Sequence, residues 1–202
     1  MTAAMIWDHL FLVFVSVLLT IGVGVPLGVL AYTCKPWRRT VLWLVEVLQT
    51  VPAMALLGII MVFLGAGKAT VVTGLLLYSL LPVVQNTCLG LTQVDPGVKE
   101  VARGMGMTKL YRLLHVEGPI AFPYIFTGIR IAVVTSVGVA VFATFVGGGG
   151  LGRAIYQGIR VSNMGLILRS TTTLMVMAVG FDIILALVEK RLYQRFSPGS
   201  RT

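Results

Sequence analysis

Five long apolar stretches constrain the fold of this 202-residue chain more than any other feature. Each can cross a hydrocarbon core of about 30 Å, which takes roughly 20 helical residues. They are continuously apolar rather than alternating like barrel strands, and a helix satisfies its own backbone hydrogen bonds inside a bilayer. The sequence therefore predicts an all-α fold, a polytopic membrane helical bundle with about five transmembrane helices forming a single domain over residues 1–202. We place the spans near residues 10–32, 41–64, 69–93, 124–147 and 165–188.

The composition favours a membrane protein over a soluble one. Hydrophobic residues make up 57% of the chain and charged residues only 11%, and a soluble domain of this size could not bury that much apolar surface. The net charge of +9 does not predict nucleic-acid binding, because the basic residues lie in short clusters between the apolar stretches. Cys34 and Cys88 have no His or acidic residue at metal-ligand spacing, so we expect neither a metal site nor a disulfide framework.

The basic clusters predict the direction of the chain in the membrane. They follow the first, third and fifth spans, so they share one side, and short loops rich in Lys and Arg stay in the cytoplasm. The N-terminus is therefore expected outside and the C-terminus in the cytoplasm, with the loop over about 95–123 on the cytoplasmic side. The residues of this side are Lys35, Arg38, Arg39, Lys99, Arg103, Lys109, Arg112, Lys190, Arg191, Arg195 and Arg201, against Lys68, Arg153, Arg160 and Arg169 on the other.

The loop over 95–123 has the pattern of two short helices joined by a glycine turn. Asp95 can cap a helix and Pro96 suits its first turn. Gly104 and Gly106 are poor interior helix residues, which predicts a break there. Such an amphipathic pair can dock into a groove on a partner, and the alternative is an ordinary amphipathic loop lying on the bilayer surface. The apolar positions at helical spacing are Val98, Val101, Ala102, Met105, Leu110, Leu113 and Leu114.

The same loop resembles the EAA motif of ABC importer permeases. Glu100-Val101-Ala102, three residues, Gly106, nine residues and then Val116-Glu117-Gly118-Pro119 keep the spacing of that motif. Val101 and Gly118 depart from the family pattern, which has Ala and Leu there. In this family the segment forms the coupling helix that docks on the ATPase subunit. The resemblance therefore implies an ATPase-coupling role for Glu100, Ala102, Gly104, Gly106 and Pro119.

Two further stretches resemble one subfamily, the permeases for glycine betaine, carnitine, choline and related solutes. They are the Gln49-Thr50-Val51-Pro52-Ala53-Met54-Ala55-Leu56-Leu57 stretch and the glycine-rich run from Phe145 to Gly152. The resemblance implies a permease subunit of an ATP-driven importer in the bacterial inner membrane, working by alternating access on a quaternary amine osmoprotectant. It implies three partners: a cytoplasmic ABC ATPase dimer, an extracytoplasmic solute-binding protein and a second, identical or paralogous permease.

The chain is not expected to be an enzyme or to bind a cofactor. No G-x-x-x-x-G-K-[ST] motif is present in the sequence, so ATP and Mg would be bound by the partner ATPase. Gly147, Gly149 and Gly152 fit G-x-G-x-x-G, but a membrane span precedes them where a dinucleotide site needs a strand, and we expect a flexible external turn.

Polar side chains within the spans are candidates for the substrate pathway, because such groups are costly in a bilayer and tend to face a water path or the bundle interior. These candidates are Gln49, Thr50, Pro52, Gln85 and Asn86. Hydrogen bonds that only hold the helices together are an equally open interpretation. Asp182 and Arg130 are each expected to pair with an oppositely charged neighbour or to face an interface.

Other functions remain open at this point. A secondary transporter or channel would need ionisable pairs at mid-membrane or inverted repeats. A permease for another small solute, such as an amino acid, or a membrane scaffold is also compatible with the spans alone.

Overall fold

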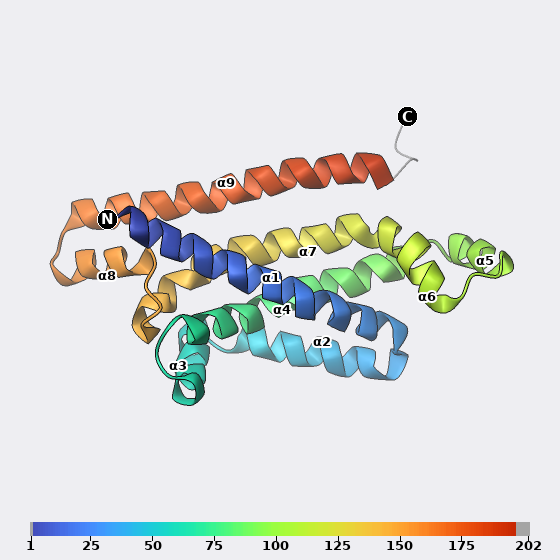
Figure 1. Cartoon of the computed structure of the whole chain (residues 1–202), viewed down its shortest axis with the longest axis horizontal. Helices are drawn as coiled ribbons and strands as arrows, with labels where there is room; N and C mark the ends of the chain where they lie inside the picture. The colour runs from blue at the N-terminus through green and yellow to red at the C-terminus, as the bar shows by residue number, and fades with distance from the viewer. Residues whose placement is uncertain (1, 197–202) are drawn as a thin grey trace.

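The computed structural model describes the backbone of residues 2–196 and the side chains as far as residue 192, and every regular element in this part is helical (Figure 1). The all-α prediction is confirmed for these residues. In chain order the elements are α1 (Ala3–Thr33), α2 (Lys35–Thr50), α3 (Ala53–Leu64), α4 (Lys68–Gln93), α5 (Pro96–Gly104), α6 (Lys109–Arg112), η1 (Leu113–Glu117), α7 (Gly118–Val139), η2 (Ala140–Val146), α8 (Gly152–Arg160) and α9 (Met164–Phe196).

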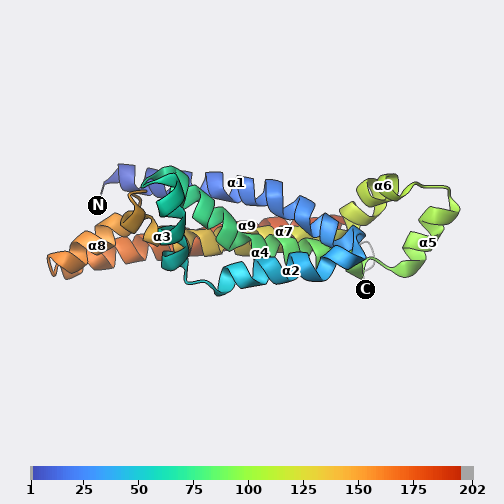
Figure 2. The same ribbon diagram turned by 90° about the horizontal axis from the view of Figure 1, so that it is seen from below.

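The long helices lie roughly along one axis, and the short ones gather at its two ends. Figures 1 and 2 show α1, α2, α4, α7 and α9 running lengthwise. The N-terminus of α1 lies at the same end as α3 and α8, whereas α5 and α6 project from the opposite end, where α9 finishes. The loop over 95–123 is therefore at the far end of the bundle from the start of α1.

Four of the five predicted spans are confirmed as long apolar helices. The stretches Ala3–Thr33, Lys68–Gln93, Lys109–Val146 and Met164–Leu192 are each long and apolar enough to cross a membrane. The span expected near 124–147 begins earlier than predicted, because the helix continues unbroken from Lys109.

The span predicted near 41–64 is not a single straight helix. The chain bends by 100° between α2 and α3. Val51 is extended, with ψ of 127°, as expected of a residue before proline, and Pro52 cannot donate a backbone hydrogen bond to continue the helix. Residues 35–64 therefore form a broken pair of helices, counted as a fifth span only if both parts are taken together.

Small residues let the central helices approach closely. A Cβ added at Gly28 of α1 would lie 2.5 Å from the Cβ of Thr87 on α4. On the other side of α4, a Cβ at Gly128 of α7 would lie 2.5 Å from the carbonyl oxygen of Pro82. Contacts of this kind are typical of membrane helix packing, in which dispersion between close backbones replaces the hydrophobic driving force. The stack α1–α4–α7 is the packed core of the bundle.

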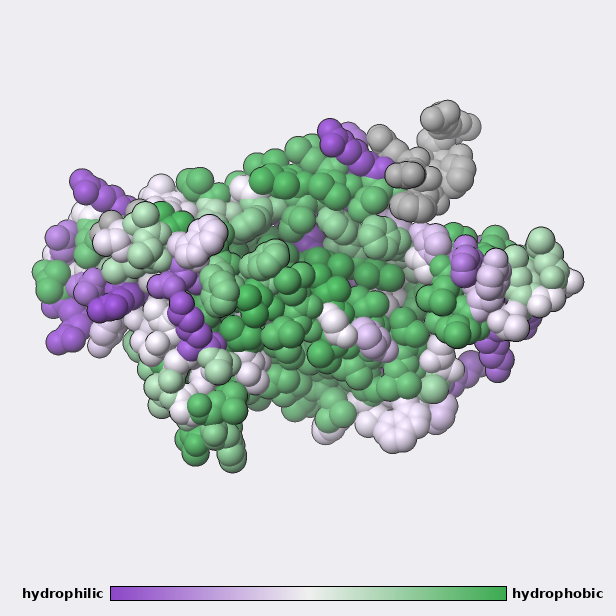
Figure 3. All heavy atoms as spheres, viewed as in Figure 1, coloured by the Kyte–Doolittle hydropathy of each residue, from purple (hydrophilic) through white to green (hydrophobic). Residues whose placement is uncertain are grey.

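The outer surface between the two ends is mostly apolar. The space-filling view shows hydrophobic residues covering the middle of this face, with hydrophilic residues gathered mainly toward the ends (Figure 3). An 18-residue apolar window of α9 has no buried residue, and Phe14, Val62 and Met175 are among the large apolar side chains more than 60% exposed. Such a surface suits a hydrocarbon surrounding rather than water.

The predicted glycine-rich turn is present, and it packs against the start of α1. Gly147, Gly149 and Gly150 have φ of 77°, 80° and 81°, a region that favours glycine. Gly148 and Gly150 are buried, and Gly150 approaches the buried His9 of α1. A 3₁₀ helix precedes the turn and a helix follows it, so among the described residues it has no strand of the kind that a dinucleotide site requires.

Candidate functional site

The projecting segment (residues 95–117) begins with a capped helix, as predicted. The Asp95 carboxylate accepts hydrogen bonds from the backbone N–H groups of Gly97 (2.7 Å) and Val98 (3.2 Å), and Pro96 occupies the first turn of α5. The first N–H groups of a helix have no partner within the helix. Asp95 accepts from two of them, and Pro96 has no N–H that would need a partner. The local sequence therefore defines where α5 begins.

Gly106 ends this helix by adopting a left-handed conformation. Its φ is +79°; its N–H donates to the carbonyl of Arg103 (2.9 Å), while the Met107 N–H donates to that of Ala102 (3.2 Å). This pair of bonds is a Schellman motif, in which glycine is preferred because it has no Cβ to clash. The predicted glycine turn is present, although Gly104 lies within the last turn of α5 and only Gly106 has a positive φ.

The second part of the segment differs from the predicted separate short helix. Thr108 caps α6, and a π-helical turn over Leu113–Glu117 then leads directly into α7. The Gly118 N–H donates to the carbonyl of Leu113, and a Cβ at Gly118 would lie 2.8 Å from that oxygen. Pro119, which has no N–H, follows in the first turn of α7, where a widened turn accommodates its ring. A larger residue at position 118 would crowd the Leu113 carbonyl, which explains why glycine stands there.

The projecting segment presents an apolar surface to its surroundings. Five large apolar side chains are more than half exposed, although they lie outside the bundle, and Glu100 beside them is also exposed. The space around Gly104 and Gly106 is open, with no atom within 4 Å of an added Cβ. Ala102, by contrast, is only 4% exposed and packs inside the segment. A small apolar patch rimmed by polar groups is typical of a docking surface. The exposed apolar residues are Val101, Met105, Leu110, Tyr111 and Leu114.

A buried carboxylate that sequence reasoning did not single out holds this segment to α1. Glu117 is 1% exposed; its Oε1 accepts from Arg112 Nε and its Oε2 accepts from the Tyr32 hydroxyl, each at 2.5 Å. Both carboxylate oxygens are therefore satisfied, as a buried charge requires. The sequence did offer one sign of this contact, an acidic residue within a basic stretch next to a span. It could not indicate the partner, because Tyr32 lies 85 residues away in sequence.

One pathway candidate joins α2 to α4, and a second forms a hydrogen bond within α4. Pro82 has no N–H, so the carbonyl of Tyr78, four residues earlier, lacks its helical donor. Gln49 Nε2 donates to that carbonyl at 3.4 Å. Asn86 Nδ2 donates to the carbonyl of Pro82 within the same helix (2.8 Å). The Gln49 bond is of the helix-joining kind that was the alternative interpretation, whereas the Asn86 bond stays within α4.

The side chains of the other three pathway candidates form no hydrogen bond to another helix in the described part of the chain. Thr50 is exposed and bonds to the carbonyl of Val47 in its own helix, Pro52 forms the break before α3, and Gln85 is exposed. Within the described part of the chain, no hydrogen bond joins any two of the five candidate side chains. The structure of this single chain therefore does not gather them into one binding site.

An ion cluster connects α7 to α9 within the stretches Lys109–Val146 and Met164–Leu192. Arg130 forms two bonds to Asp182, Nε to Oδ1 at 2.8 Å and Nη2 to Oδ2 at 3.0 Å, and its Nη1 bonds to Glu189 at 2.8 Å. Thr127 donates to the other oxygen of Glu189. Asp182 and Arg130 were each expected to pair with an oppositely charged neighbour or to face an interface; the structure pairs them with each other, and Glu189 is a further member that the sequence did not indicate. Two carboxylates and one guanidinium leave the cluster with a net negative charge.

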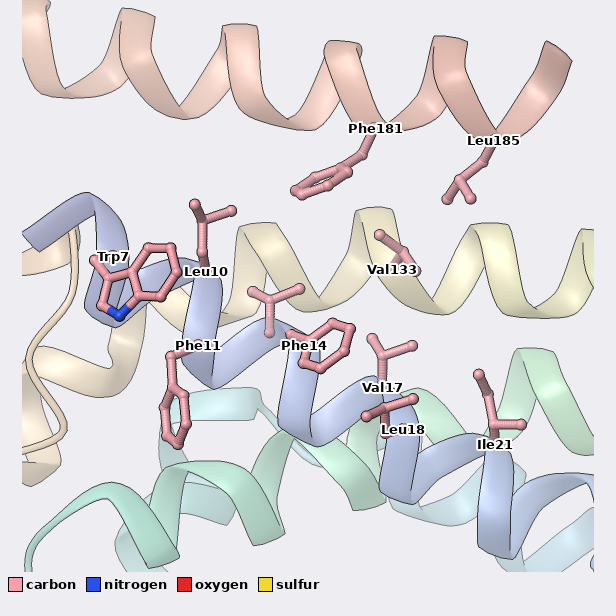
Figure 4. A pocket seen from close by; sticks show the side chains of 11 residues that line it. Trp7, Leu10, Phe11, Phe14, Val17, Leu18, Ile21, Val133, Phe181 and Leu185 are labelled. Carbon is pink, nitrogen blue, oxygen red and sulfur yellow. The ribbon is translucent and has the colours of Figure 1, made fainter. Parts of the chain in front are cut away.

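One groove is apolar and offers little to a polar ligand. It has a volume of about 590 Å³ and lies between α1 and α9, over Val133 of α7 (Figure 4). Trp7, Phe11 and Phe14 of α1 face it, and every lining residue is aliphatic or aromatic. It therefore suits hydrocarbon, from lipid or from another helix, rather than a small charged solute.

Comparison with known proteins identifies the family. Residues 24–201 match the family described as "binding-protein-dependent transport system inner membrane component". The carnitine transport permease protein OpuCD of Listeria monocytogenes is 39% identical over 187 residues, 92% of this chain and 84% of that protein. The osmoprotectant import permease protein OsmW of Salmonella typhimurium is 40% identical over 188 residues (91% and 87%), and the choline transport system permease protein OpuBD of Bacillus subtilis 38% over 185 (91% and 82%).

The fold also matches a solved structure. A chain of the inward-facing MetNI methionine ABC transporter superimposes with a TM-score of 0.85, covering 94% of each chain at 24% identity. The arrangement of helices is therefore that of a known importer, with the projecting segment at one end of the bundle. The chain belongs to the family of binding-protein-dependent transport system inner membrane components: it is a multi-pass permease subunit of an ABC importer and not itself an enzyme.

Proposed function

We propose that this permease imports a quaternary amine osmoprotectant, such as glycine betaine, carnitine or choline, by alternating access. The observation that carries the proposal is the 38–40% identity, over 91–92% of the chain, to permeases named for carnitine, choline and osmoprotectants. The methionine transporter shares the fold at 24% identity and so gives no guide to the solute. High-affinity selection of the solute would belong to the extracytoplasmic binding protein.

The proposed orientation has the N-terminus outside and the projecting segment in the cytoplasm. It is supported by the basic residues Lys35, Arg103 and Lys109, which lie together at the end of the bundle from which the segment projects. Loops rich in Lys and Arg are retained on the cytoplasmic side. The end of α9 lies at this same end, which would place the C-terminus in the cytoplasm (Figure 1).

The projecting segment would be the site at which a dimer of ATPase subunits couples to the permease. Glu100 would meet the ATPase as an exposed charge, and the open space beside Gly104 lets a partner approach the backbone. Ala102 and Gly106 would hold the turn in shape, and Pro119 would mark the rigid entry to α7. ATP-driven closure of the ATPase dimer would then move α7 through the continuous helix from Lys109.

A second permease, identical or paralogous, would complete the pathway. Thr50 and Gln85 are exposed and, among the described residues, form no hydrogen bond to another element, so we propose that they face the passage together with Gln49, Pro52 and Asn86. A passage for a zwitterion or cation needs weak polar groups that release the solute readily, which amides and hydroxyls provide. The whole chain would act as one permease domain.

Reconstitution would test this function. The permease, its ATPase and its binding protein are placed in proteoliposomes, and uptake of labelled glycine betaine, carnitine, choline and methionine is measured with and without internal ATP. We expect ATP-dependent uptake of at least one quaternary amine and none of methionine. Uptake that persists without ATP would identify a secondary transporter, and uptake of methionine alone would contradict the substrate class.

A further inference from the structure

A basic pocket lies where the α1–α2 hairpin meets the projecting segment. Its volume is about 330 Å³, and it combines side chains from the last turn of α1, the first residue of α2, the end of α5 and the α6–η1 turn. The pocket is distinct from the pathway candidates and from the exposed apolar patch of the segment. Its lining residues are Tyr32, Thr33, Lys35, Arg103, Lys109, Arg112, Leu113 and Glu117.

The charges in this pocket do not balance. Glu117 is its one acidic residue, and both of its oxygens are already engaged by Arg112 and Tyr32. Lys35, Arg103 and Lys109 are exposed, and none of them forms an ion pair with an acidic residue in the part of the chain that the structure describes. Three unpaired cations around one concavity repel one another, and a multivalent oxyanion would relieve that repulsion.

The position of the pocket indicates where such an anion would come from. Thr33 is the last residue of the membrane-crossing α1, so the pocket lies at the level where headgroup phosphates begin. Trp37, four residues beyond, is 60% exposed, as expected of an aromatic side chain at a membrane interface. Basic pockets between membrane helices on the cytoplasmic side are suited to anionic lipid headgroups.

We propose that this pocket binds the phosphate of an anionic phospholipid headgroup, with Lys35, Arg103 and Lys109 as its ligands. The planar guanidinium of Arg103 can bind two phosphate oxygens at once, while the two lysines act as point charges. The proposed orientation decides only which leaflet supplies the lipid. A phosphate held in this way would join the start of α2 to both halves of the projecting segment.

Lipid binding to the purified complex tests the proposal. The permease–ATPase complex in detergent is titrated with phosphatidylglycerol and examined by native mass spectrometry, as wild type and as the double variant Arg103→Gln/Lys109→Gln. The matched control Arg38→Gln/Arg39→Gln removes the same charge from exposed positions of α2 outside the pocket. We expect about thirtyfold weaker binding in the pocket variant and near wild-type binding in the control, since each of the two cations removed contributes about 1 kcal/mol near a lipid phosphate.

Two additional arms separate lipid from other ligands. Phosphatidylcholine, which has the same phosphate but no net charge, should bind much more weakly than phosphatidylglycerol. Inorganic phosphate at millimolar concentration should displace the lipid only partly, because it lacks the glycerol and acyl contacts. Equal losses in the two double variants, unchanged binding in the pocket variant, equal binding of the two lipids, or full displacement by inorganic phosphate would each overturn the proposal.

Discussion

The side-chain amide of Gln49 on α2 donates to the backbone carbonyl of Tyr78 on α4, the carbonyl that Pro82 leaves without its helical donor. A side chain from one helix thus repairs a gap in the backbone of another. In a membrane helix such repair matters, because an unpaired carbonyl has no bulk water to bind. The contact links the α2 helix, which ends at the Val51–Pro52 break, to the middle of α4 just before Pro82.

We predict that Gln49→Leu destabilises the permease only while Pro82 is present. The substitution leaves the Tyr78 carbonyl unpaired and should lower the free energy of unfolding by about 1 kcal/mol. In a Pro82→Ala background the restored N–H of residue 82 satisfies that carbonyl, so Gln49→Leu should have little further effect on thermal unfolding. Equal destabilisation in both backgrounds would contradict this account. Because Gln49 is also proposed to face the passage, uptake should stay reduced in the double variant.

Gly106→Ala should uncouple the permease from its ATPase more than it destabilises the bundle. A Cβ at φ of +79° costs roughly 1–2 kcal/mol and distorts the turn that closes α5. We expect reduced co-purification of the ATPase and reduced ATP-driven uptake, with thermal unfolding of the spans nearly unchanged. Gly138→Ala is the control, since Gly138 is helical and a Cβ there meets no atom within 4 Å. Normal ATPase capture by Gly106→Ala would rule out the proposed role of the turn.

Glu117→Gln should loosen the projecting segment from α1. The change removes the charge that Arg112 and Tyr32 share and leaves the buried guanidinium without a counter-ion, at a cost of about 3 kcal/mol. Hydrogen exchange of the 95–117 amides should accelerate, while that of α4 stays slow. Tyr32→Phe, which keeps the Arg112–Glu117 ion pair, should give a smaller effect of the same kind. A larger effect for Tyr32→Phe than for Glu117→Gln would be inconsistent with the ion pair as the main contact.

Arg130→Met should weaken the attachment of α9 to α7. It leaves the two carboxylates Asp182 and Glu189 facing each other without a cation, in a chain region where charge is costly. We expect a lower midpoint of thermal unfolding and faster proteolysis within α9. The control is Lys68→Met, which breaks the exposed ion pair with Asp8 and should change stability little. Similar behaviour of the two variants would show that the cluster does not hold α9.

Gly28→Leu should disrupt the packing of α1 on α4, whereas Gly22→Leu should not. An added Cβ at Gly28 would meet Thr87 at 2.5 Å and the backbone oxygen of Val84 at 2.8 Å, and a Cβ at Gly22 would meet no atom within 4 Å. Both glycines lie in the same helix, so the pair separates a loss of close approach from a change of helix propensity. Folded yield after purification and thermal unfolding report the difference. Equal yields would argue against the close α1–α4 contact.

The sequence by itself determined the class of fold and where α5 begins and ends. Continuous apolar stretches can only be helices in a bilayer, and local chemistry at Asp95, Pro96 and Gly106 defines a cap and a turn whatever lies around them. The resemblance of the 95–123 loop to a family motif likewise depends on spacing alone. These features could be predicted because each is decided by residues close together in the chain.

Only the tertiary structure decided how polar groups are shared between helices. The pairing of Glu117 with Tyr32, the inclusion of Glu189 beside Arg130, and the use of Gln49 to satisfy Tyr78 all depend on which helix faces which. A polar residue in an apolar span must find a partner, but its own neighbours in sequence do not specify that partner, because close contacts between helices join residues far apart in the chain. The sequence shows which side chains need a hydrogen-bond or ion-pair partner, and only the packed bundle shows which residue that partner is.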